Sequence, residues 1–154
     1  MGAETRLREL GIDLPPAAAP VASYVPVRIA AGLAFVAGQV PLEDGKPMVT
    51  GRLGAELDTE EGARLARRCG IQALAALRAE LGSLDQVAGV VKVTVWVAST
   101  DGFTEQPRVA NGASDLFVEV FGDAGKHARS AVSAPSLPLG APVEVEMVAT
   151  VAVP

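Results

Sequence analysis

The sequence has little of what several protein classes require, with 1 Cys, 1 His and 4% aromatic residues among 154. The single cysteine, Cys69, cannot form an internal disulfide bond, and together with one histidine it leaves too few soft ligands for a structural zinc site. No apolar run is long enough to cross a bilayer, and the charged N-terminus lacks the apolar centre of a signal peptide. We therefore expect a cytoplasmic protein that does not enter a membrane.

Positive charge is also scarce, with 13 Lys and Arg against 18 Asp and Glu and a net charge of -5. Neutralisation of phosphates supplies most of the affinity of proteins for nucleic acid, and stacking on aromatic rings supplies much of the rest for single strands. Nucleic acid is therefore not an expected partner. Hydrophobic residues make up 49% of the chain, which is enough for the core of one domain.

The elements follow from periodicity and from turn residues. A short helix over 3–11 and a Pro-rich arm form an N-terminal segment, residues 1–20, ahead of a main domain, residues 21–154. Asp58 followed by Glu61 indicates the start of a long helix that ends near Leu81, and Thr104 is the expected cap of a second helix that ends before Gly122. Strands are expected at Val25–Ala31, Leu33–Ala37, Val87–Val97, Ala128–Ser133 and Val143–Val153, and residues 41–57 are expected to be a loop.

This order of elements predicts an α+β fold, a mixed sheet with two helices packed on one face. Along the last strand, Val143, Val145, Met147 and Val151 alternate with Glu144, Glu146 and Thr150. The apolar set is expected to face the helices and the polar set to lie on the other face. Cys69, on the long helix predicted to end near Leu81, is interpreted as a core residue.

The last two strands suggest a pair of charged residues. An antiparallel hairpin that pairs Ser133 with Gly140 places Arg129 directly opposite Glu144, on the polar face. One interpretation is a structural cross-strand ion pair, which spacing alone favours. The other is a site in which the guanidinium grips a carboxylate and Glu144 orients water or moves a proton. His127 has no serine nucleophile pattern near it and is interpreted as a surface residue.

Several segments in a fixed order carry a resemblance to a known family. They are Phe35–Pro41 (FVAGQVP), Asn111, Ala128–Val132 (ARSAV) and Val143–Glu146 (VEVE). Over about Tyr24 to Val153 the chain resembles the RidA/YjgF family of reactive intermediate deaminases, which has the older label endoribonuclease L-PSP. The resemblance implies a chorismate-mutase-like fold of the bacillus type. It also implies a homotrimer in which three sheets form a central barrel, with clefts for small molecules between subunits.

The resemblance further implies an activity. Family members hydrolyse enamine and imine intermediates such as 2-aminoacrylate to 2-oxo acids and ammonia, without cofactor or metal, as 2-iminobutanoate/2-iminopropanoate deaminases. Carried over to this sequence, Arg129 binds the substrate carboxylate and Glu144 positions water. Tyr24, Gly38 and Asn111 occupy other pocket positions. The partners would then be a small 2-imino or 2-oxo acid and two further copies of the chain.

The chain also departs from the family pattern. Ala37 stands where a serine is usual, and Ala131 stands where a cysteine is common. Both changes remove polar groups from the pocket, and the N-terminal arm and the 41–57 loop are longer than in compact members. These departures favour the alternative of a trimeric protein without catalysis that binds a carboxylate metabolite or has a regulatory role. The pairing of Arg129 with Glu144 favours the enzyme.

Overall fold

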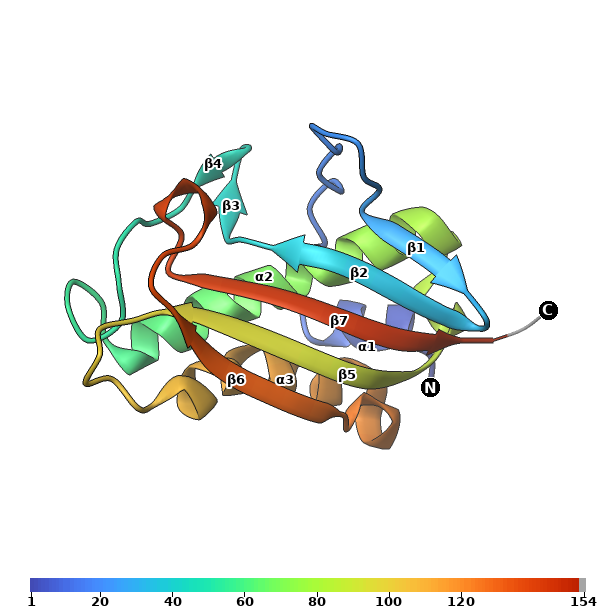
Figure 1. Cartoon of the computed structure of the whole chain (residues 1–154). Coiled ribbons are helices and arrows are strands. Elements are labelled where there is room, and N and C mark those ends of the chain that lie inside the picture. Colours follow the sequence, from blue (N-terminus) through green and yellow to red (C-terminus); the bar gives the residue numbers. More distant parts are fainter. Residues whose placement is uncertain (153–154) are drawn as a thin grey trace.

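The computed structural model describes residues 1–152, and it places a mixed sheet in front of two long helices (Figure 1). The helices are α2 (Thr59–Leu81) and α3 (Gln106–Phe121), and a short α1 (Ala3–Glu9) contacts α3. Short 3-10 turns lie at Leu84–Gln86, Gly122–Gly125 and Pro138–Gly140. The predicted α+β architecture, with two helices on one face of a mixed sheet, is confirmed.

The sheet has 5 strands in the order β1-β2-β7-β5-β6. Their bounds are β1 Val27–Ala30, β2 Leu33–Gln39, β5 Val87–Ala98, β6 Ala128–Ala134 and β7 Val143–Val151. β5 and β6 are parallel, whereas β1 with β2, β2 with β7, and β5 with β7 are antiparallel. The predicted hairpin between the last two strands is therefore wrong, because β5 lies between them. β5, α3 and β6 form a strand–helix–strand unit. In such a unit the helix crosses over the sheet and the two strands pair in parallel.

The predicted start of α2 at Asp58 is confirmed, whereas the predicted cap of α3, Thr104, lies one residue before the observed cap. The Asp58 carboxylate accepts a hydrogen bond of 2.8 Å from the backbone N–H of Glu61, and α2 ends at Gly82. α3 is preceded by Glu105 rather than by Thr104, and Glu105 forms no capping bond with its side chain. The Glu105 carboxylate instead accepts a 2.7 Å hydrogen bond from the hydroxyl of Thr59, which joins the starts of the two helices.

Alternation along β7 separates a buried face from an open one. Val143, Val145, Met147 and Ala149 are buried against the helices, and Glu144, Glu146, Val148 and Thr150 lie on the other side. Val151 ends β7 half-buried, and the predicted end of this strand at Val153 lies outside the described residues. In β5 a register shift between Val90 and Lys92 leaves Val91 42% exposed, although strict alternation would bury it.

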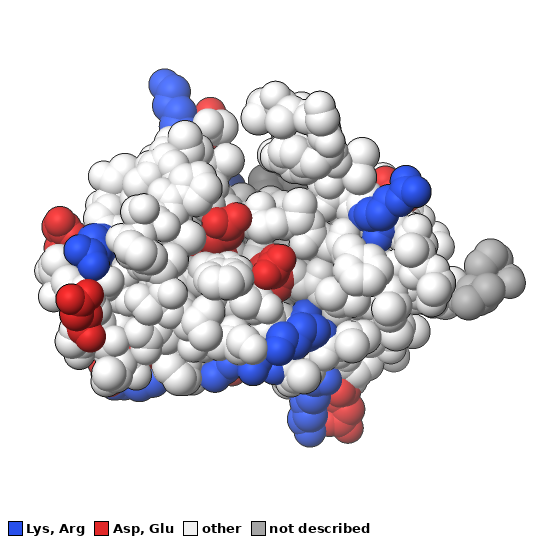
Figure 2. All heavy atoms as spheres, viewed as in Figure 1, with Lys and Arg blue, Asp and Glu red and all other residues white. Residues whose placement is uncertain are grey.

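The open face of the sheet has no helix over it within residues 1–152. Three of its large apolar side chains, Phe35, Trp96 and Val132, are exposed. Figure 2 views this face and shows a mostly uncharged surface with a few acidic and basic groups near its middle. Such a face is typical of a surface that another protein chain covers.

The segment expected to be a loop contains a second, small sheet. β3 (Leu42–Glu43) pairs with β4 (Lys46–Pro47), and the connecting Asp44 and Gly45 have φ of 50° and 75°. Positive φ at both central residues is typical of a type I′ hairpin turn. Beside this hairpin the N-terminal arm runs from Leu10 to Pro26 without regular structure, and both rise above the sheet in Figure 1. The division of the chain at residues 20 and 21 stays a prediction.

Candidate functional site

One group of the predicted site residues lines a cavity of about 460 Å³ between the N-terminal arm, β2 and the start of β7. Tyr24, Gly38 and Glu144 all contribute to its wall, as does Ala37, which stands where the family usually has serine. Tyr24 is 53% exposed and comes from the arm. The cavity thus joins residues that are more than 100 positions apart in the sequence.

Gly38 and Glu144 are in direct contact. A Cβ on Gly38 would lie 2.2 Å from the Oε1 atom of Glu144, so any larger residue at position 38 must displace the carboxylate. The ladder between β2 and β7 shifts register between Val36 and Gln39, at this same position. The bulge and the glycine together create the space into which the carboxylate fits.

The environment of Glu144 raises its pKa. Burial is the larger cause, because a half-buried carboxylate loses hydration, and the negative charge of Glu146 is the second. Glu146 is engaged elsewhere, since its Oε1 accepts a 3.2 Å hydrogen bond from the indole of Trp96. Among the described residues, no side chain or backbone N–H donates a hydrogen bond to the carboxylate of Glu144. A carboxylate with a raised pKa is suited to accept or donate a proton during a reaction.

The second group of predicted residues lies on the helix side of the sheet. Nη1 of Arg129, on β6, donates hydrogen bonds of 2.8 Å to Oδ1 of Asn111 and 3.2 Å to Oγ of Ser114. Asn111 and Ser114 are one turn apart on α3, so both acceptors meet the same nitrogen. Nε and Nη2 of Arg129 form no hydrogen bond within residues 1–152. The fork formed by these two nitrogens is the edge that binds carboxylates in bidentate fashion.

His127 contacts Ser114, one of the two residues that hold Arg129. His127 lies 2.6 Å from the carbonyl oxygen of Gly125 through Nδ1 and 2.9 Å from the Ser114 hydroxyl through Nε2. A carbonyl only accepts, so we assign the proton to Nδ1, and the Ser114 hydroxyl then donates to Nε2. His127 is also in edge-to-face contact with Phe117. His127, interpreted from the sequence as a surface residue, is instead half-buried with both ring nitrogens in hydrogen bonds, and Ser114 joins the group without any sequence signal.

The two groups lie on opposite faces of the sheet. Arg129 is in register with Val93, which is buried under the helices, whereas Glu144 is in register with Trp96 on the open face. Residues paired in this way share a face, so Arg129 and Glu144 do not form the expected cross-strand pair. Ala131, two positions after Arg129, lies on the same side as the arginine. The site residues of one chain thus form two separate groups, one on each face of the sheet.

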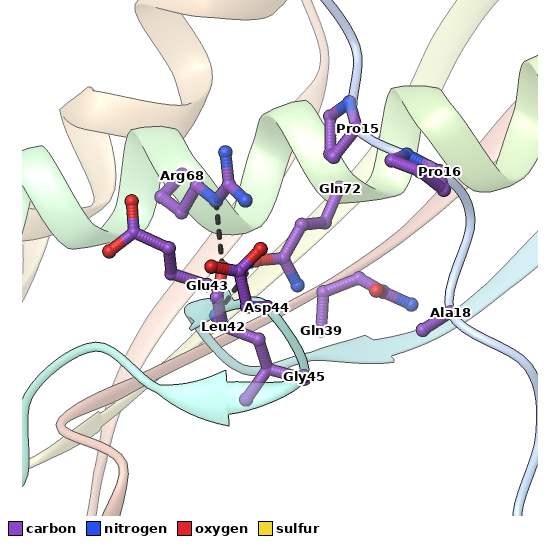
Figure 3. Close-up of a pocket in the computed structure, with 10 residues that line it drawn as sticks. All are labelled: Pro15, Pro16, Ala18, Gln39, Leu42, Glu43, Asp44, Gly45, Arg68 and Gln72. Atoms are coloured by element: carbon purple, nitrogen blue, oxygen red, sulfur yellow. Dashed lines mark hydrogen bonds between the residues drawn. The ribbon is translucent and has the colours of Figure 1, made fainter.

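A second cavity, of about 410 Å³, continues from the first under the arm and beside the β3–β4 hairpin (Figure 3). Its floor is α2, from which Arg68 and Gln72 project. Gln72 accepts a 2.9 Å hydrogen bond from the backbone N–H of Leu42 and donates one of 2.8 Å to the carbonyl of Val40. Arg68 donates through Nε to the carbonyl of Leu42 at 3.0 Å. We call this cavity the Arg68 chamber.

The acidic and soft side chains form no metal centre in the described part of the chain. No group of three or more His, Cys, Asp or Glu residues in it is arranged to hold an ion. Cys69 is fully buried, as expected, and burial raises the pKa of its thiol strongly. No helix within residues 1–152 has the length and apolar character to span a bilayer.

Comparison with known proteins identifies the family. A family described as YjgF/chorismate mutase-like, putative endoribonuclease, matches residues 4–151. The chain belongs to this YjgF family. The protein TCP17 of Trypanosoma cruzi is 49% identical to it over 141 residues, which cover 91% of this chain and 88% of TCP17. The resemblance drawn from FVAGQVP, ARSAV and VEVE is thus confirmed for the family and the fold.

Two solved structures show how closely the YjgF fold is kept. Atu1372 of Agrobacterium tumefaciens, a protein of unknown function, is 42% identical with a TM-score of 0.89, over 97% of this chain and 92% of that one. A putative endoribonuclease of Shewanella oneidensis is 31% identical with a TM-score of 0.94, over 98% of this chain and 100% of that one.

Proposed function

We propose that the protein hydrolyses reactive enamine and imine intermediates, such as 2-aminoacrylate, to 2-oxo acids and ammonia. It does so in the cytoplasm as a homotrimer of the 2-iminobutanoate/2-iminopropanoate deaminase type. Arg129 binds the substrate carboxylate and Glu144 handles the proton of the attacking water. Asn111 and Ser114 hold the arginine, and Tyr24 and Gly38 shape the wall beside Glu144.

The position of the two charged residues on opposite faces is the observation that carries this proposal. One small substrate cannot touch Arg129 and Glu144 of the same chain, because the sheet lies between them. A cleft in which Arg129 of one copy meets Glu144 of the next brings both to one molecule. The exposed apolar side chains of the open face supply a reason for copies to associate, since burial of apolar surface drives assembly.

The chemistry needs few groups beyond these. Transfer of a proton from water to C3 of 2-aminoacrylate gives the protonated 2-imino acid, and the fork of Arg129 fixes its carboxylate. A water molecule then attacks C2 while Glu144 accepts a proton from it, which forms a carbinolamine. Glu144 returns that proton to nitrogen, the C–N bond breaks to release ammonia, and the hydroxyl group gives up its proton to water, which leaves the 2-oxo acid. A raised pKa makes the Glu144 carboxylate a stronger base, which favours uptake of the proton from water.

The proposal is tested by generating 2-aminoacrylate in the cuvette with a pyridoxal-phosphate lyase and following its loss. The wild-type protein should speed the decay over buffer. Arg129→Ala should reduce the second-order rate constant by roughly tenfold to a hundredfold, which is the value of a charge-assisted contact. Binding of pyruvate without any acceleration would refute the deaminase and support the alternative, a trimeric carboxylate-binding or regulatory protein.

A further inference from the structure

We propose that the Arg68 chamber is a subsite for the substrate side chain, and that the protein takes 2-imino acids whose side chain ends in a carboxylate. This inference rests on the proposed function, because it assumes that the reacting end of the substrate lies beside Glu144. It adds a class of substrate to that function, and it assigns a recognition role to Arg68.

The chamber is continuous with the cavity that contains Glu144. Both are lined by Ala18 on the arm, Gln39 on β2, Leu42 and Gly45 on the hairpin, and Gln72 on α2. A molecule bound against Glu144 can therefore extend past Gln39 toward Arg68 without leaving the protein surface. Glu144 lies against Gly38 and Arg68 binds the carbonyl of Leu42, and the Cα atoms of these two residues are at most roughly 14 Å apart because they are four positions apart in the chain. A side chain of several carbons can span a separation of this order.

Arg68 differs from every other arginine on α2 in its pairing. Arg64 binds Glu61 at 2.8 Å, Arg67 binds Glu119 at 2.7 Å, and Arg78 binds Glu4 at 3.6 Å. Within residues 1–152, no carboxylate lies within salt-bridge distance of Arg68. Its Nε is fixed by the carbonyl of Leu42, while Nη1 and Nη2 have no hydrogen-bond partner in the same range. A guanidinium that is oriented in this way presents two nitrogens to a planar anion.

The surroundings hold this guanidinium in place. Gln72 is 8% exposed and both ends of its amide are hydrogen-bonded, which makes the floor rigid. Pro15 and Pro16 pass over the chamber, and Figure 3 shows them on the arm beside Arg68 and Gln72. Glu43 and Asp44 also line the chamber but are exposed, so solvent and salt screen their charges. A carboxylate in contact with Nη1 and Nη2 is screened much less.

The experiment compares two 2-oxo acids of equal length, which are product analogues that differ only at the far end. Titration calorimetry on the intact protein should give a dissociation constant for 2-oxosuberate that is roughly tenfold or more below that of 2-oxooctanoate. Arg68→Gln should bring the ratio of the two constants close to one, and Arg68→Lys should restore part of it. Arg64→Gln, one turn away on α2 and outside the chamber, is the matched control and should keep the ratio.

The outcomes separate this inference from the function on which it rests. Equal affinity for the two acids in the wild type, or a ratio that survives Arg68→Gln, would overturn the subsite while pyruvate binding and turnover of 2-aminoacrylate stand. Failure of pyruvate and both longer acids to bind would overturn the proposed function and the subsite together. Because both acids are measured on each variant, a general loss of folded protein lowers both signals and leaves the ratio intact.

Discussion

Replacement of Ser114 tests how Arg129 is held, because the Ser114 hydroxyl connects the arginine to His127. Ser114→Ala removes the 3.2 Å acceptor of Nη1 and the 2.9 Å donor to Nε2 of His127. Asn111 remains as a second acceptor at 2.8 Å, so the guanidinium is loosened rather than released. The fork formed by Nε and Nη2 then samples orientations that do not match a bound carboxylate.

The size of the effect follows from this geometry. A hydrogen bond to a charged group is worth about 1.5–3 kcal/mol, but Arg129 is partly exposed and water replaces part of the lost contact. We therefore expect a loss of about 1 kcal/mol, which corresponds to a fall in kcat/KM of roughly fivefold. The assay is decay of 2-aminoacrylate with saturating lyase, together with titration of pyruvate.

Ser114→Thr is the control, because it keeps the hydroxyl on the same helix. It should recover most of the activity, and the pyruvate affinity should follow kcat/KM in both variants. Full activity in Ser114→Ala would refute the idea that this hydroxyl orients Arg129. An equal loss in Ser114→Thr would attribute the effect to packing of α3 instead.

Three further predictions concern Glu144, Gly38 and assembly. The pKa of Glu144 is raised in the folded state, so the negative charge of Glu144 opposes folding above the ordinary pKa of a carboxyl group. Glu144→Gln should therefore unfold at a higher urea concentration than the wild type at pH 7. The difference between the two midpoints should vanish as the pH falls below about 4. A lower midpoint at pH 7 would contradict that pKa. Gly38→Ala should lower turnover at least tenfold with little change in unfolding temperature, because the new Cβ displaces the flexible carboxylate of Glu144 and not the backbone. Unchanged kinetics in this variant would show that the position of Glu144 does not affect catalysis. Light scattering should give a mass near three times the 15.7 kDa of one chain, and a monomer that retains activity would refute the shared cleft.

Much of the fold could be predicted because its signals are local. The Asp58 carboxylate and Gly82 bound α2 as expected. Alternation along β7 correctly places Val143, Val145 and Met147 on the buried face and Glu144 and Glu146 on the other. The pairing of strands is not local. The last two strands are predicted to pair as a hairpin, but β5 lies between β6 and β7. The unit formed by β5, α3 and β6 carries the needed information, since a strand, helix and strand in succession favour parallel pairing.

The site shows the same division between local and distant information. The part of the sequence that resembles the family contains the predicted site residues Arg129, Glu144, Tyr24, Gly38 and Asn111. Their separation into two groups on opposite faces depends on which face each strand presents. Ser114 gives no signal in the sequence, because its role depends on His127, which lies outside α3. The Arg68 chamber exists only because the arm and the hairpin come together over α2.

The burial of Cys69 has a practical consequence for studying the arm. The thiol is fully enclosed and lies 3.8 Å from the carbonyl of Val143, and its raised pKa keeps it protonated, so thiol reagents will not modify it in the folded protein. A cysteine introduced at the exposed Ala18, which borders both cavities, would therefore be the only thiol that a dye or spin label can reach. The chain needs no prior removal of cysteine, and the signal of such a label would report directly on the position of the arm with and without a ligand beneath it.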